Sequence, residues 1–93
     1  MMKLKPEEIE LKGQWNFNGS EVENDAVCDR IEWLVENQLK QINTDKSGWD
    51  TLYQDPYDNR FWELIYPQSH MHGGGPPMLK YLSNHKAQKK YQL

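Results

Sequence analysis

The sequence predicts an α+β domain with a small antiparallel β-sheet of about four strands, in the order β-α-β-β-β, and one long amphipathic helix packed on one face. Three observations carry this prediction. An apolar period of 3.6 residues runs through the first half of the chain, and the period changes to two after Gly48. Turn-forming residues, rather than further helices, separate the alternating segments. The 93 residues suffice for one compact domain with one core.

The first predicted elements are a strand and the helix. The alternation in QWNFN, residues 14–18, is typical of a half-buried strand. The helix is expected from about residue 21 to about residue 42, because Ser20 and Glu23 have the spacing of a capping box. Gln38 lies inside the apolar arc and needs a hydrogen-bond partner if it is buried. The arc comprises Val27, Ile31, Leu34, Val35, Leu39 and Ile42, with Cys28 at its edge as a small buried residue.

The second half of the chain predicts three strands. Residues 49–54 and 60–66 alternate around DPYDN, so they form a hairpin with a short loop. The strand at 60–66 is apolar on both faces apart from Arg60 and Glu63, which favours a central position in the sheet. Residues 78–83 supply the last strand. We expect a single domain over 1–93, with an N-terminal tether or short helix at 1–12, a core at 13–83 and a basic tail at 84–93.

Composition and charge exclude several classes of function. Aromatic residues make up 12% of the chain, which argues against disorder despite a mean hydropathy of -1.00. The net charge is -3, and six acids against one arginine fall within residues 21–36, so nucleic-acid binding is not expected. The single Cys28 excludes an internal disulfide and fits a reducing compartment. The chain has neither a signal-peptide pattern nor an apolar run of membrane length, so we expect a cytoplasmic protein without a membrane partner.

The stretch HMHGGGPP, residues 70–77, raises the question of a phosphate or metal site. A P-loop needs a lysine followed by Ser or Thr after its glycines, and then a helix. Here two prolines and a predicted strand follow the glycines, so the sequence argues against a phosphate-binding loop. His70 and His72 supply half of a zinc shell, and no spacing places a third ligand from Glu63, Asp55, Asp58 or His85 beside them. The sequence shows equally weak signals for a nucleophilic or acid-base catalytic site. The remaining interpretation is a rigid structural loop made by Gly73, Gly74, Gly75, Pro76 and Pro77.

Two surfaces are candidates for partner binding. One is the acidic helix face with Asp29, Glu32 and Glu36, together with Trp33. Trp33 lies opposite the apolar arc, so either a terminal segment covers it or it is an exposed anchor. The other surface is the loop region, with Asp55, Asp58, Glu63, His70 and His72.

The segment DPYDNRFWELIYPQSHMHGGGPPML resembles the signature block of immunity protein family 27, found in bacterial polymorphic toxin systems. CDRIEWLVENQL and LKGQWNF resemble the same family, and the likeness covers roughly residues 3–83. The resemblance implies a small α+β protein that binds and neutralises a cognate protein toxin, without catalytic residues or a cofactor. The alternative is a metal-binding module or metal-dependent enzyme that uses His70 and His72.

The resemblance is carried residue by residue by the second half of the chain. An acidic residue is common in the family where this chain has His70, which weakens the metal reading. Asn59 stands where a glycine is frequent, and asparagine tolerates positive φ. The matching positions are Asp55, Pro56, Asp58, Arg60, Trp62, Glu63, Tyr66, Pro67, His72 and Gly73 to Pro77.

Overall fold

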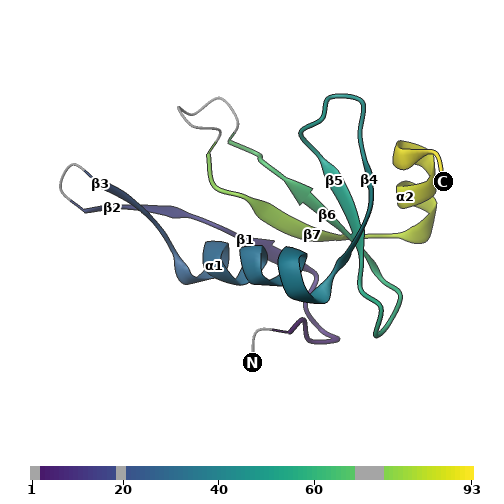
Figure 1. The fold of residues 1–93 in the computed structure, drawn as a ribbon, viewed down its shortest axis with the longest axis horizontal. Coiled ribbons are helices and arrows are strands. Elements are labelled where there is room, and N and C mark those ends of the chain that lie inside the picture. Colours follow the sequence, from purple (N-terminus) through teal and green to yellow (C-terminus); the bar gives the residue numbers. More distant parts are fainter. Residues whose placement is uncertain (1–2, 19–20, 69–74) are drawn as a thin grey trace.

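A five-stranded antiparallel sheet forms the centre of the computed structural model, which describes residues 3–18, 21–68 and 75–93. The strands lie in the order β1-β7-β6-β5-β4, and a separate two-stranded sheet of β2 and β3 extends away from the body (Figure 1). The elements are β1 Glu10–Lys12, β2 Trp15–Asn18, β3 Glu21–Asn24, α1 Ala26–Trp33, the π-helical turn η1 Leu34–Gln38, β4 Lys40–Thr44, β5 Thr51–Gln54, β6 Phe61–Ile65, β7 Met78–Leu82 and α2 Asn84–Tyr91.

The predicted α+β class and the central position of the strand at 60–66 are confirmed. β6 lies third of five, paired with β5 through the DPYDN hairpin and with β7 on its other side. The sheet has five strands rather than about four, because two segments that we expected outside it pair with its edges, while the strand predicted at 14–18 pairs with β3 in the separate sheet instead. Residues 10–12 pair with β7, and residues 40–44 pair with β5.

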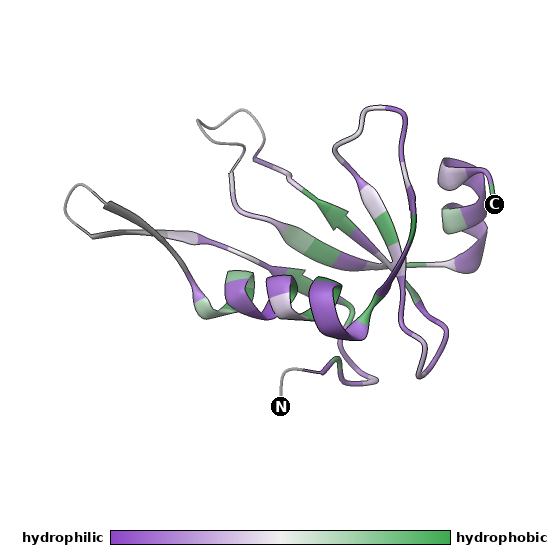
Figure 2. Cartoon of the chain, in the orientation of Figure 1, coloured by the Kyte–Doolittle hydropathy of each residue, from purple (hydrophilic) through white to green (hydrophobic). Residues whose placement is uncertain are grey.

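The two helices pack against opposite faces of the sheet. Alternation within β6 sends Trp62 toward α1 and its neighbour Glu63 toward α2. Hydrophobic residues are concentrated in the central strands, whereas α2 is mainly hydrophilic (Figure 2). The cluster on the α1 side contains Leu11, Ile31, Leu34, Leu39, Tyr53, Trp62 and Leu79, and the cluster on the α2 side contains Leu52, Leu82, Ala87 and Tyr91.

The predicted start of the helix is wrong. Residues 21–24 form β3, which pairs with β2 in register from Trp15↔Asn24 to Asn18↔Glu21. The N-cap is Asp25, whose carboxylate accepts a hydrogen bond of 2.8 Å from the Cys28 amide. Residues 21–24 pair with β2 instead of starting the helix, so the local preference for a capping box at residues 20–23 is overridden.

The predicted end of the helix is also wrong. α1 widens into η1, where the Leu39 amide donates to the Leu34 carbonyl at 2.7 Å, and the chain then becomes β4. Leu39 packs on the α1 side of the sheet and Ile42 on the α2 side, which one continuous helix face could not achieve. Two finer predictions are confirmed: Cys28 is buried, and buried Gln38 donates to Asp55 Oδ1 at 3.1 Å.

Both terminal segments contribute to the fold. The N-terminal segment, residues 3–8, is held by arginines: Arg30 donates to the Lys3 carbonyl and to the Glu8 carboxylate, and Arg60 donates to the carbonyls of Lys5, Pro6 and Glu8. The basic tail forms α2, whose Ala87 and Tyr91 are buried against the sheet.

Candidate functional site

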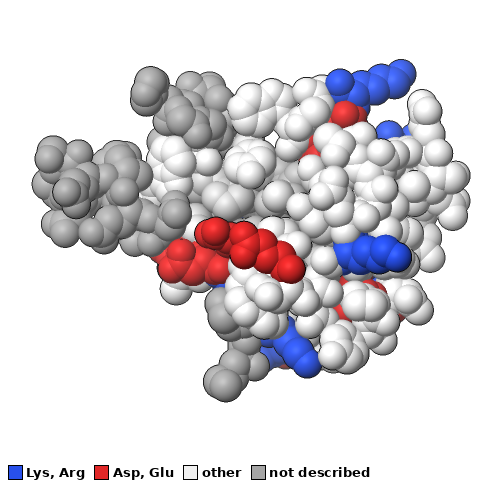
Figure 3. Space-filling model, in the orientation of Figure 1, with Lys and Arg blue, Asp and Glu red and all other residues white. Residues whose placement is uncertain are grey.

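The exposed face of α1 and η1 carries three carboxylates. Asp29, Glu32 and Glu36 are all exposed, because Ile31 and Leu34 take the inner side of the same helix. Acidic side chains gather over α1 on the face seen in Figure 3. Among the described residues, none of these three carboxylates has an ion-pair partner within 4.0 Å. The predicted acidic face is therefore exposed, and no described residue neutralises it.

An apolar pocket of about 260 Å³ lies beside this acidic face, between α1 and the end of β6. Glu32 belongs to both the acidic face and the lining of the pocket, so the two features are adjacent. The pocket also joins segments that are far apart in the sequence. Its described lining residues are Trp15, Cys28, Ile31, Glu32, Val35, Leu64, Tyr66, Gly75 and Pro77.

An aromatic pair extends the apolar surface from the pocket. Tyr66 lines the pocket, and its ring meets the ring of Trp49 edge-to-face, with centroids 6.0 Å apart. Trp49 is 56% exposed, which makes it the most exposed tryptophan for which exposure is described. The sequence-based reasoning missed Trp49. The alternation in WDTLYQ could have revealed it, because Trp49 shares a parity with Tyr53, which faces α1.

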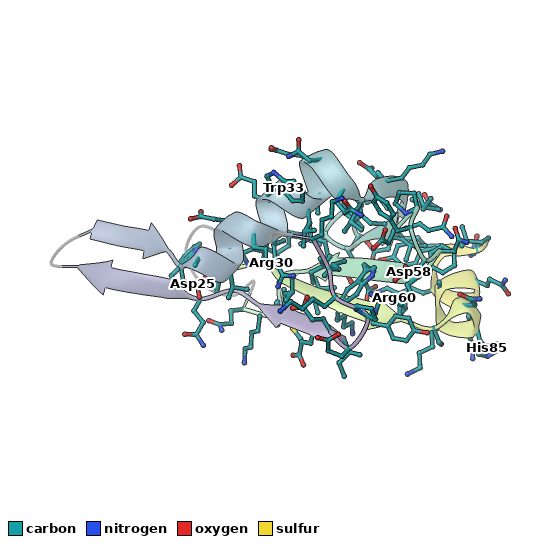
Figure 4. The ribbon with its side chains drawn as sticks, turned by 90° about the horizontal axis from the view of Figure 1, so that it is seen from below. Asp25, Arg30, Trp33, Asp58, Arg60 and His85 are labelled. Carbon is teal, nitrogen blue, oxygen red and sulfur yellow. The ribbon has the colours of Figure 1, made fainter. Side chains whose placement is uncertain are left out.

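Trp33 is less exposed than Trp49. It is half-buried and packs against the α1-side cluster, as does Leu4 of the N-terminal segment. This position fits the interpretation in which a terminal segment helps to cover Trp33. Figure 4 also shows Trp33 well apart from the hairpin turn that carries Asp58 and Arg60.

The two acids of the hairpin turn hold the local structure. Asp55 is only 3% exposed, and its Oδ1 accepts from Gln38 Nε2 at 3.1 Å and from the Tyr57 amide at 2.9 Å. Asp58 accepts from the Arg60 amide at 3.0 Å and from Arg60 Nε at 2.6 Å. Arg60 also lies over the Trp62 ring, 4.9 Å from its centroid. These contacts fix the turn and leave Asp55 no accessible surface for a partner.

Glu63 is buried at the centre of the sheet, at 1% exposure, on the face opposite the pocket. Its carboxylate accepts from Tyr91 Oη at 2.8 Å and lies within salt-bridge distance of Lys90 and Lys80. Burial, together with the hydrogen bond to Glu63, raises the pKa of the Tyr91 hydroxyl far above its usual range. Glu63 and Asp55 thus bind different partners and form no carboxylate pair.

The described part of the glycine-proline loop confirms a close backbone approach. Gly75 has φ of +77°, and a Cβ there would lie 2.4 Å from the Gln68 carbonyl oxygen. The Pro77 carbonyl accepts from the Gly13 amide at 2.9 Å, which joins the loop to the segment before β2. Asn59 has the positive φ expected of it, at 63°. His70, His72, Gly73 and Gly74, with the rest of 69–74, lie outside the described residues.

Neither a metal centre nor a bilayer-spanning helix is found in the described chain. Within residues 3–18, 21–68 and 75–93, no three His, Cys, Asp or Glu side chains are grouped so that they could hold a metal ion. The helices of the same ranges are too short and too polar to cross a membrane.

Comparison with known proteins identifies the family. No curated protein and no solved structure matches the chain. The family model described as Immunity protein 27 matches residues 17–83, which is well over half of the chain and includes α1, η1 and the strands from β3 to β7. This chain belongs to the Immunity protein 27 family.

Proposed function

We propose that this protein neutralises a cognate bacterial toxin by binding it directly, and that the toxin docks on the acidic face of α1 and η1. The protein acts in the cytoplasm of the producing bacterium, as a binding partner rather than an enzyme, and without a cofactor. Membership of the immunity family supports the class of function. The observation that supports the surface is the set of three exposed carboxylates without ion-pair partners among the described residues.

These carboxylates repel one another. Asp29 and Glu32 are three residues apart, Glu32 and Glu36 are four apart, and like charges at such spacings cost about 0.2–0.5 kcal/mol per pair. A surface that repels itself is stabilised when a basic partner covers it. Charge complementarity also accelerates encounter between the two proteins, which suits an inhibitor that must capture a toxin quickly.

The other carboxylates proposed from the sequence bind groups within the fold. Asp55 satisfies Gln38, Asp58 binds Arg60, and buried Glu63 binds α2. A catalytic acid or base needs an accessible position beside a substrate. Asp55 and Glu63 do not have one, because both are buried and hydrogen-bonded within the fold. This pattern supports binding rather than catalysis.

The test measures binding and protection separately from stability. The partner is the C-terminal domain of the protein encoded immediately upstream of this chain. We expect the wild type to bind this domain and protect cells that express it. The double variant Glu32→Gln/Glu36→Gln should bind at least about tenfold more weakly, while its melting temperature stays unchanged or rises because repulsion is relieved.

Glu10→Gln is the matched control. Glu10 is exposed, but Leu11 beside it points toward α1, so Glu10 faces the opposite side of the sheet. This variant should bind like the wild type. Failure of the wild type to bind or protect would overturn the proposed function, and unchanged binding by the double variant would overturn the assignment of the surface.

A further inference from the structure

We infer that the pocket between α1 and the end of β6 receives a single aromatic side chain of the toxin, and that a lysine or arginine next to that side chain pairs with Glu32. This inference rests on the proposed function and specifies the chemistry of the docking segment. It concerns a site that the sequence did not suggest, because its lining comes from four separate parts of the chain.

The size of the pocket favours one side chain over a small-molecule ligand. Pockets for drug-sized ligands and cofactors usually measure roughly 300–1,000 Å³. At about 260 Å³ this pocket falls below that range. Aromatic side chains bury the most area per residue, and tryptophan and tyrosine are the most frequent anchors in such interface pockets.

The walls of the pocket offer the right chemistry to an aromatic ring. Ile31, Val35 and Leu64 supply aliphatic surface, and Tyr66 supplies an aromatic wall. Trp15 also lines the pocket, so an incoming ring would find two aromatic neighbours, and the Trp49 ring packs edge-to-face against Tyr66. Edge-to-face and offset ring contacts are favoured beyond the area they bury.

The backbone part of the pocket is fixed before a partner arrives. The buried Gly75 packs tightly against the Gln68 carbonyl, and the Pro77 carbonyl is bonded to the Gly13 amide. A wall of this kind needs little reordering when a ligand enters, and preorganisation lowers the entropic cost of association.

The acidic residues beside the pocket favour a basic residue next to the toxin's aromatic residue. Glu32 lines the pocket, and Asp29 and Glu36 lie on the same exposed helix face. An apolar centre with acids along one edge is complementary to an aromatic residue flanked by Lys or Arg. An acidic flank would meet repulsion at the same place.

The principal experiment introduces a bulky side chain into the pocket or removes an aromatic ring beside it. It then measures the affinity for the C-terminal domain of the protein encoded upstream. Val35→Trp places a bulky ring in the pocket, and Trp49→Ala removes an exposed ring outside the core. We expect each variant to bind at least about tenfold more weakly, as for a central anchor. Tyr57→Ala is the matched control, because Tyr57 is 73% exposed and lies in the hairpin turn at the other end of β6.

The outcomes separate this inference from the proposed function. If the wild type binds and protects while Val35→Trp and Trp49→Ala bind as tightly as the wild type, the pocket inference is overturned and the proposed function stands. If the wild type does not bind, the proposed function is overturned. Trp49→Ala keeps the test informative even if Val35→Trp does not fold.

A second measurement needs no toxin. Amide NMR spectra of the protein are recorded during titration with three tripeptides: lysine–tryptophan–lysine, glutamate–tryptophan–glutamate and lysine–alanine–lysine. The first peptide should shift the amides of Val35, Leu64 and Tyr66 at roughly millimolar concentration, whereas the other two should not. Equal shifts with the alanine peptide, or shifts confined to other surfaces, would overturn the inference.

Discussion

Acidification should destabilise this protein through the ion pair that joins the N-terminal segment to α1. Arg30 donates two hydrogen bonds to the Glu8 carboxylate, one of 2.7 Å from Nη1 to Oε2 and one of 2.6 Å from Nη2 to Oε1. The hydrogen bonds and charge of Arg30 lower the pKa of Glu8 from 4.5 to about 2.

The sign and the size of the effect follow from these two pKa values. Because the folded protein has the lower pKa, the unfolded chain takes up the proton first as the pH falls. The stabilisation is therefore complete above about pH 4.5, decreases between about 4.5 and about 2, and is absent below that. A difference of about 2.5 between the pKa values corresponds to about 3 kcal/mol. Since both side chains are about one-fifth exposed and solvent weakens the pair, we expect about 1–2 kcal/mol.

Urea unfolding of the wild type and of Glu8→Gln checks this prediction. At about pH 7 the variant should have a free energy of unfolding lower by about 1–2 kcal/mol, and the difference should shrink toward zero near pH 2. Glu7→Gln is the control, because Glu7 is an exposed neighbour in the same segment and should show no such difference. If the free energies of unfolding of the wild type and Glu8→Gln differ by a constant amount from neutral pH to pH 2, the reasoning is refuted.

Three further substitutions test contacts that hold the rest of the fold. Tyr91→Phe removes the buried hydrogen bond to Glu63 and should cost about 1–3 kcal/mol in urea unfolding. Because the pKa of Tyr91 is raised above 10.0, the wild type should also lose stability above about pH 10, and a variant with the same alkaline loss would contradict this account. Gly75→Ala should lower the thermal midpoint by several degrees, since its Cβ would collide with the Gln68 carbonyl at positive φ, and a midpoint equal to wild type would count against that geometry. Asp25→Ala should cost about 1 kcal/mol through loss of the N-cap, with Asp25→Ser retaining most of the stability.

The strands of the second half could be predicted because their local signals agree with their tertiary roles. The period-two segments became β5, β6 and β7, and the turn residues between the first two became their hairpin. The apolar faces of the strand at 60–66 indicated a central strand, since only such a strand is covered on both sides. Here the alternation and the turn chemistry point to one structure.

The first half could not be predicted as well because its local signals allow two structures. Residues 21–24 carry helix-start features, yet they pair with β2. Leu39 and Ile42 continue the helical period, yet they also fit a strand that places them on opposite sides of the sheet. Strand pairing between distant residues decided both cases, and a window of neighbouring residues does not contain that information.

The candidate site also has a part that could be predicted from the sequence and a part that could not. The acidic face could be predicted because its charges lie on one short helical stretch. The sequence left two interpretations of Trp33 open, a covered side chain or an exposed anchor, and its packing against the α1-side cluster fits the first, whereas Trp49 is 56% exposed. The exposure of a large side chain depends on which distant segments pack around it.

By itself, the sequence determined the α+β class, the hairpin around residues 55–60 and the acidity of one helix face. These features depend on neighbours along the chain: alternation, turn chemistry and helical spacing. The tertiary structure alone decided that residues 21–24 and 40–44 are strands, that Glu63 is held by α2, and that Glu32, Leu64, Tyr66 and Gly75 surround one pocket. Those features depend on which faces meet when the chain buries its apolar surface, a free-energy balance summed over the whole fold.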